Sequence, residues 1–182
     1  MINQKLISTI ENNLEELSKT WFDEAVKSEI MTTYHHFTDD QNYNRGKAVY
    51  ENLLKWLKAG ALRDEVEKYF NKVGAIRLNE GFPLSEIHYA LYLSKKVFWG
   101  FVDWRDAISG SFQNSSTTQI MAVLNDYFDL GNFYITQGYF NELITKLDDD
   151  KKFSKNDIKN LLMQSAVDWD NINEDEIIWR PV

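Results

Sequence analysis

Six polar or aromatic side chains recur at helical spacing in a stretch whose pattern is otherwise that of a buried core. They are Arg77, Glu80, His88, Tyr92, Lys95 and Trp99. The last four follow one another at steps of four, three and four residues, which brings them onto one face of an α-helix. The first two are three residues apart and can pair across one helical turn. We name these six residues the polar stripe and predict that it faces inward, within an apolar seam.

The residue types of the polar stripe allow three interpretations. In the first, Arg77 and Glu80 form a partly buried ion pair. His88 then hydrogen-bonds to its neighbours, and Lys95 extends past Trp99 to water. In the second, Arg77, His88 and Lys95 hold a small anionic or polar ligand in a pocket walled by the two aromatic side chains. In the third, the stripe lies in a subunit interface, where Trp, Tyr and Arg are enriched.

The sequence contains none of the common catalytic signatures, such as Gly-x-Ser-x-Gly, the phosphate-binding Gly-x-x-x-x-Gly-Lys-Ser/Thr or Gly-x-Gly-x-x-Gly. Because there is no cysteine, thiolate nucleophiles and Cys-based metal sites are excluded. The adjacent His35 and His36 have the setting of solvated loop residues, and His88 lies on an apolar face where a phosphodonor does not reach. We therefore predict a protein that is not an enzyme and has no metal ion or cofactor.

The amino-acid composition limits the classes of protein to which this chain can belong. A chain of 182 residues with 43% hydrophobic residues fits a globular domain with a substantial core. The 28 acidic residues exceed the 20 basic ones, and the net charge of −8 argues against binding to nucleic acid or to an anionic membrane. The amphipathic N-terminus does not read as a secretory signal, and no apolar run is long enough to span a membrane. We expect a cytoplasmic location.

Apolar residues with a period near 3.6 predict an all-α fold, a bundle of five to six helices with a globin-like arrangement as one option. The expected helices span about 3–31, 45–59, 62–80, 84–108, 117–147 and 154–166. Proline at position 83 and the glycine two residues before it separate the third helix from the fourth. We predict one sensor-like helical domain over 1–166 and an acidic, tryptophan-containing tail over 167–182.

Two glycines lie seven residues apart on the predicted inward face of the longest helix. Gly131 and Gly138 should each cost about 1 kcal/mol relative to alanine in a helix interior. Close packing of a crossing helix is the expected reason for both, and space left for a ligand is the alternative.

A dense motif carries a family resemblance. It comprises Trp21, VGAIR at 73–77, EGFPLSEI at 80–87, Ala90-Leu91 and Lys96-x-x-Trp99. The motif resembles the N-terminal domain of RsbR/RsbRD-type proteins, the RsbT co-antagonists of bacterial stress signalling, over about residues 5–105. The resemblance implies an all-helical sensory or interaction domain, often dimeric and without catalytic activity of its own. Residues 110–182 show neither the strand–helix alternation of the STAS domain that follows in RsbR proteins nor kinase motifs.

Part of the same stretch is also similar to globin-coupled sensors. The position of their haem-ligating histidine aligns with Arg77 or close to it, and arginine does not ligate haem iron. The resemblance therefore implies a globin-like sensor without haem. Together these features predict a non-enzymatic signalling module that acts as a homodimer and through a signalling protein partner. The alternative is a sensor that binds a small molecule or haem in a pocket lined by the polar stripe.

Overall fold

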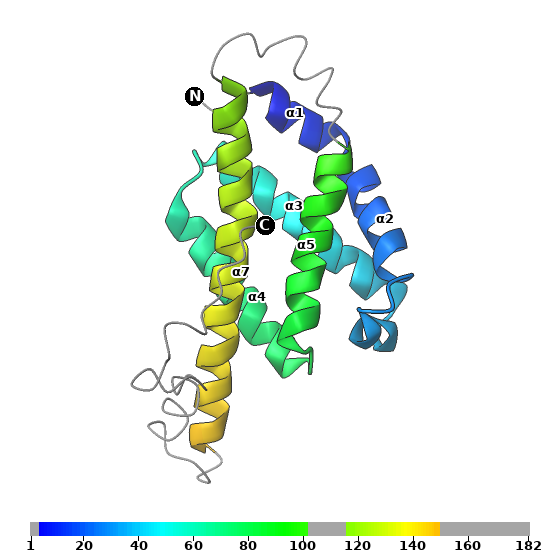
Figure 1. The fold of residues 1–182 in the computed structure, drawn as a ribbon, viewed down its shortest axis with the longest axis vertical. Helices are drawn as coiled ribbons and strands as arrows, with labels where there is room; N and C mark the ends of the chain where they lie inside the picture. Colours follow the sequence, from blue (N-terminus) through cyan, green and yellow to red (C-terminus); the bar gives the residue numbers. More distant parts are fainter. Residues whose placement is uncertain (1–3, 102–115, 150–182) are drawn as a thin grey trace, which may run out of the picture. The chain divides into compact units, whose positions relative to one another are not determined.

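The computed structural model describes residues 4–101 and 116–149. Within these two ranges every secondary-structure element is helical, which confirms the all-α prediction (Figure 1). The elements are α1 (Gln4–Asn12), α2 (Leu14–Ala25), the short 3-10 helix η1 (Thr32–His36), α3 (Asp39–Lys58), α4 (Arg63–Asn79), α5 (Leu84–Phe101) and α7 (Ser116–Asp149).

The chain divides into two compact units, Met1–Glu142 and Leu143–Val182. The first unit holds α1 to α5 and most of α7. In the second unit, the described residues are only the last turns of α7. The predicted helix over 154–166 and the predicted boundary after residue 166 therefore fall outside the described residues.

The predicted first helix over 3–31 is two helices. The break falls at Asn13, whose side-chain amide donates to the carbonyl of Thr9 at 2.7 Å. This bond satisfies a helical carbonyl without continuing the backbone ladder, which is how asparagine competes with helix propagation. The second of the two helices ends at Ala25, six residues before the predicted end.

The helix predicted to start at about residue 45 starts at Asp39. Thr38 caps it through a reciprocal pair of bonds, because its hydroxyl accepts from the Gln41 backbone N–H while the Gln41 side chain accepts from the Thr38 backbone N–H. Two aspartates in the first turn add a favourable interaction with the helix dipole. The capping box therefore starts the helix at Asp39, although the residues before position 45 do not show the apolar period of a helix.

The turn between α4 and α5 places an aromatic ring in the core. Gly81 adopts a φ of 84°, and its N–H donates to Leu78 while the N–H of Phe82 reaches back to Arg77. These are the two bonds of a Schellman motif, which requires the left-handed conformation that glycine adopts without penalty. Phe82, directly after the turn, is 1% exposed.

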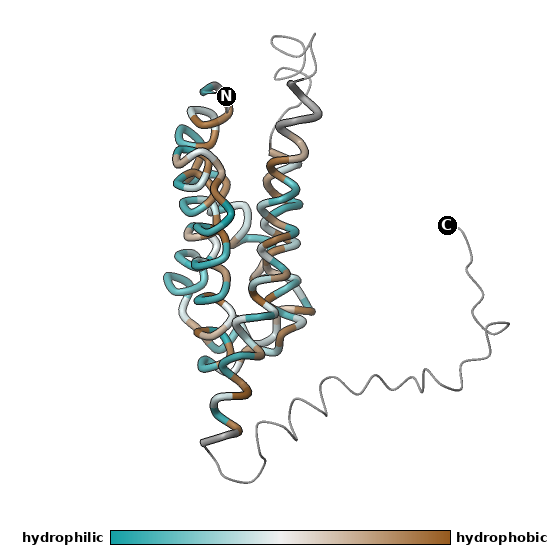
Figure 2. The backbone as a smooth tube through the Cα atoms, turned by 90° about the vertical axis from the view of Figure 1, so that its left-hand side faces the viewer, coloured by the Kyte–Doolittle hydropathy of each residue, from teal (hydrophilic) through white to brown (hydrophobic). Residues whose placement is uncertain are grey.

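Buried aromatic side chains join the helices of the first unit by donating to backbone carbonyls. Trp21 of α2 donates to Ala90 of α5, Tyr50 of α3 donates to Ser94 of α5, and Tyr127 of α7 donates to Val49 of α3. Each bond satisfies the polar tip of a large apolar side chain in the interior. Figure 2 colours the backbone by hydropathy and shows hydrophobic and hydrophilic segments alternating along the helices.

Glycines set the separation of α4 and α7. A side chain at Gly138 of α7 would overlap the backbone of Asn71 of α4, and one at Gly74 of α4 would overlap the carbonyl of Ile135 of α7. A Cβ at Gly131 would lie 2.9 Å from side-chain atoms of Leu91 and Phe70. Both Gly131 and Gly138 therefore lie at close helix contacts, and the space beside them is filled by protein.

Candidate functional site

The polar stripe of α5 lies at the edge of the buried face, not at its centre. The buried residues of α5 are Glu86, Ile87, Ala90, Leu91, Leu93, Ser94, Val97 and Phe98. Tyr92, predicted to point inward, is 54% exposed, and Trp99 is half-buried. The prediction was wrong for Tyr92 because α5 packs against α2, α3 and α4 through the face centred on Ala90 and Ser94, which lies almost opposite to Tyr92 on the helix.

His88 and Lys95 link α5 to α7. The Nε2 atom of His88 lies 2.9 Å from the hydroxyl of Thr136, and the ammonium of Lys95 lies 2.8 Å from a carboxylate oxygen of Asp129. The Asp129 side chain is 66% exposed, so this ion pair sits at the surface and contributes little to stability. The His88 contact matches the first interpretation of the stripe, whereas Lys95 pairs with a surface carboxylate and does not extend to water alone.

His88 should make stability depend on pH. Partial burial lowers the pKa of its imidazole below the ordinary value of 6.5, because burial disfavours the charged form. The unfolded chain therefore binds a proton at a higher pH than the folded chain. The stabilising contribution is present above about pH 6.5 and is lost as the pH falls through the lower folded-state pKa.

We expect His88→Gln, which keeps a hydrogen-bonding partner for Thr136 but does not titrate, to flatten the fall in stability between about pH 7 and pH 5. Urea denaturation at a series of pH values measures this. His35→Gln, in η1, is the matched control. An equal fall in stability for the wild type and the His88 variant would contradict the assignment.

Arg77 and Glu80 form the predicted ion pair, with 2.6 Å between guanidinium and carboxylate, and a second arginine joins it. Arg45 of α3 contacts the other carboxylate oxygen of Glu80 at 3.0 Å and donates to Asn42 at 3.1 Å. The side chains of Arg45, Arg77 and Glu80 are 9%, 16% and 30% exposed. One carboxylate therefore serves two guanidinium groups in a largely buried setting.

Aromatic rings surround this charge cluster. The guanidinium of Arg45 lies 4.0 Å from the ring centroid of Phe37, and that of Arg77 lies 5.6 Å from the ring centroid of Phe82. The two rings stack on each other with centroids 5.1 Å apart. Such contacts attract a cation through the negative face of the ring.

Arg45 should matter more for stability than Arg77. We expect Arg45→Ala to lower the free energy of unfolding by about 2 kcal/mol, since it removes an ion pair and a ring contact and leaves the Asn42 oxygen unpaired. Arg77→Ala should cost about 1 kcal/mol or less, because Glu80 retains Arg45 as a partner. Chemical denaturation of both variants at one protein concentration tests the order, and a larger loss for Arg77→Ala would contradict it.

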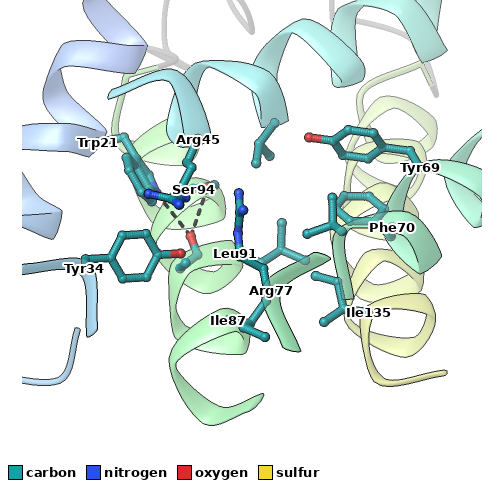
Figure 3. Close-up of a pocket in the computed structure, with 13 residues that line it drawn as sticks. Trp21, Tyr34, Arg45, Tyr69, Phe70, Arg77, Ile87, Leu91, Ser94 and Ile135 are labelled. Atoms are coloured by element: carbon teal, nitrogen blue, oxygen red, sulfur yellow. Dashed lines mark hydrogen bonds between the residues drawn. The ribbon is translucent and has the colours of Figure 1, made fainter. Parts of the chain in front are cut away.

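A cavity of about 40 Å³ adjoins the two arginines (Figure 3). Its polar lining residues are Tyr34, Arg45, Tyr69, Arg77 and Ser94, together with the indole of Trp21. Because a water molecule takes roughly 10–15 Å³ of such space, the cavity has room for about three waters. A haem macrocycle does not fit there, and of the polar stripe only Arg77 lines the cavity. The structure thus does not bring Arg77, His88 and Lys95 together around one pocket.

Glu86 is a buried carboxylate that the sequence analysis did not single out. It is 6% exposed, and its oxygens accept from both hydroxyls and one backbone N–H of Thr32 and Thr33 at 3.0–3.1 Å. The carboxylate thereby satisfies the first turn of η1 and holds that segment against α5. The only signal in the sequence is a glutamate on an apolar face, and its partners are more than fifty residues away.

Comparisons with protein-family models, with curated proteins and with solved structures find no match for this chain. The resemblance to RsbR/RsbRD-type domains and to globin-coupled sensors therefore stays a prediction. Among the residues that the structure describes, no group of three or more histidine, aspartate or glutamate side chains is placed to hold a metal ion. None of the helices in these ranges has the length and apolar character needed to cross a bilayer.

Proposed function

We propose that this protein is a non-enzymatic helical regulatory module that self-associates through the outward face of α5 and α7. The observation that carries the proposal is a pair of large aromatic side chains on this face. Tyr92 on α5 is 54% exposed, and Phe133 on α7 is 57% exposed. Interfaces are enriched in exposed aromatic residues of this kind, which contribute most of the binding energy when buried.

The two aromatic residues lie at the same level of the α5–α7 pair. The His88–Thr136 bond and the Lys95–Asp129 ion pair show that the two helices run antiparallel side by side. Tyr92 lies between the two bonded positions on α5, and Phe133 lies between the two on α7. The ring of Tyr89, 5.7 Å from that of Tyr92, extends the aromatic surface along α5.

A second copy of the chain fits this surface because the same patch can meet itself across a two-fold axis. The face also contains both an exposed acid, Asp129, and a partly exposed base, Lys95. In an antiparallel arrangement of two copies, each base can approach the acid of its partner. This is the third interpretation of the polar stripe, and the dimeric state implied by the family resemblance points the same way.

Sedimentation velocity of the full chain tests the proposal. We expect a species with twice the 21.4 kDa mass of the chain at micromolar concentration. Replacing both Tyr92 and Phe133 with serine should raise the dissociation constant by about a thousandfold or more. Each aromatic anchor contributes about 1–2 kcal/mol or more, and in a symmetric dimer each substitution counts twice.

The control is the double variant Ile30→Ser, Leu62→Ser. These residues are 53% and 58% exposed, comparable to the aromatic pair, but they lie in the connections before η1 and before α4 and not on α5 or α7. The control should sediment like the wild type. A monomeric wild type, or an equal loss of association in both double variants, would reject the proposal.

A further inference from the structure

The cavity beside α3, α4 and α5 presents positive charge and hydrogen-bond donors to a small interior space. Figure 3 shows the hydroxyl groups of Tyr34 and Tyr69 directed toward the interior from opposite sides, with the side chain of Arg77 between them. Arg45 enters from α3. The remaining walls are apolar, which strengthens any electrostatic interaction formed inside.

Each of the two guanidinium groups has more N–H donors than it uses for hydrogen bonds within the described residues. A guanidinium carries five N–H groups. Within the described residues, Arg45 uses one for Asn42 and one for Glu80, and Arg77 uses one for Glu80. Two positive charges face the single carboxylate of Glu80, so the cluster keeps an excess of one positive charge. Glu86 also acts electrostatically on Tyr34 and balances the second positive charge over the wider cluster, but its oxygens accept hydrogen bonds from the first turn of η1 and not from either guanidinium.

The tyrosine hydroxyls add donors without adding charge. Burial raises the pKa of Tyr34 to about 12, although the two nearby arginines act in the opposite direction. Burial likewise raises the pKa of Tyr69. Both hydroxyls therefore stay protonated at neutral pH and can donate to an acceptor. Trp21 and Ser94 are different, because both already donate to the carbonyl of Ala90.

We propose that this cavity binds a small planar oxyanion, such as a carboxylate of one or two carbons or nitrate, held by Arg45 and Arg77. The planar fork of a guanidinium matches the geometry of a planar oxyanion and gives paired, charge-assisted hydrogen bonds. The size follows from the cavity volume of about 40 Å³, the space of roughly three waters. The site is independent of self-association, because it lies on the opposite side of α5 from Tyr92.

Urea denaturation of the full chain tests the site, with sodium formate or acetate replacing sodium chloride at constant ionic strength. A ligand that binds only the folded chain raises the unfolding midpoint in a saturable way. We expect formate and acetate to do so and benzoate not to, because its ring exceeds the cavity. Saturation-transfer NMR on the formate proton measures binding without reference to stability.

Arg77→Lys is the test variant. Lysine keeps a positive charge that can pair with Glu80, but it lacks the planar guanidinium group. It should weaken formate binding about tenfold or more. Arg63→Lys, at an exposed position at the start of α4, should leave binding unchanged. No saturable effect of formate or acetate in the wild type, equal binding by Arg77→Lys, or equal binding of benzoate would each overturn the proposal.

Discussion

Replacing Trp21 with alanine should lower the free energy of unfolding by about 3–5 kcal/mol, the range for deleting a buried aromatic side chain. Trp21 is 1% exposed and lies in α2, where it contacts both α3 and α5. Its ring occupies the space above Gly46 of α3, where any side chain would collide with it. Its edge-to-face contact with Tyr34, at 6.0 Å between centroids, also fixes η1. Denaturation in urea, followed by circular dichroism at a fixed protein concentration, measures the loss.

Trp21→Phe separates packing from hydrogen bonding at this position. Phenylalanine keeps much of the apolar area but cannot donate to the Ala90 carbonyl. That carbonyl keeps the hydroxyl of Ser94 as a donor at 2.9 Å, so it is not left unpaired. We therefore expect a smaller loss, of about 1–2 kcal/mol. If Trp21→Ala costs less than Trp21→Phe, the packing role assigned to the ring is wrong.

Replacing Gly138 with alanine should lower the free energy of unfolding by about 3 kcal/mol. Alanine gains up to about 1 kcal/mol in helix propensity, but its methyl group would overlap the backbone of Asn71. A backbone moves aside only if α4 and α7 separate, and that separation also loosens the contacts around Gly131. Thermal unfolding should show a clearly lower Tm for the variant.

The chain offers two informative comparisons for this prediction. Gly100→Ala, near the end of α5, meets no atom within 4 Å and should raise stability by about 0.5–1 kcal/mol. Gly74→Ala lies on the other side of the same helix crossing, so combining it with Gly138→Ala should cost less than the sum of the single losses. A stabilised Gly138→Ala variant would show that the two helices are not held as close as the structure places them.

The sequence analysis succeeded where one face of a long helix is buried throughout. On α7, the helical period that places Gly131 and Gly138 on the inward face places Leu124, Phe128 and Ile135 there too, and all three are buried. The end of α4 and the start of α5 were also predictable, because glycine and proline between them stop a helix for local reasons. Local signals were missed where one side chain decides the outcome, as with Asn13 at the α1–α2 break and Thr38 at the start of α3.

The candidate site was harder to predict because its partners come from distant parts of the chain. The pair Arg77–Glu80 is local and was foreseen. Its third member, Arg45, lies 35 residues from Glu80 and joins it only after α3 and α4 pack together. The exposure of Tyr92 was missed for a related reason. Helical periodicity identifies the side chains that share a face, but the neighbours of α5 decide which of its mixed faces is buried.

The two proposals use opposite sides of one helix. On α5, Leu91 lines the cavity beside the arginines, while the next residue, Tyr92, points to the outward face. Occupation of the cavity and self-association can therefore be measured separately, with Arg77→Lys affecting the first and the aromatic double variant the second. A negative result for one proposal therefore does not reject the other.

Site-specific cross-linking tests the central claim, self-association through the α5–α7 face, most directly. The chain has no cysteine, so a single introduced thiol reports one position. Lys96→Cys and Gln137→Cys place exposed thiols only four residues from Tyr92 and Phe133 on the same helix faces, close enough to the proposed two-fold axis for the two copies of each thiol to be joined. With a short bismaleimide linker, both should give a product of doubled mass in buffer and none in urea, while Glu29→Cys gives none in either. Equal cross-linking at Glu29→Cys, or none at the two interface positions, would contradict the account.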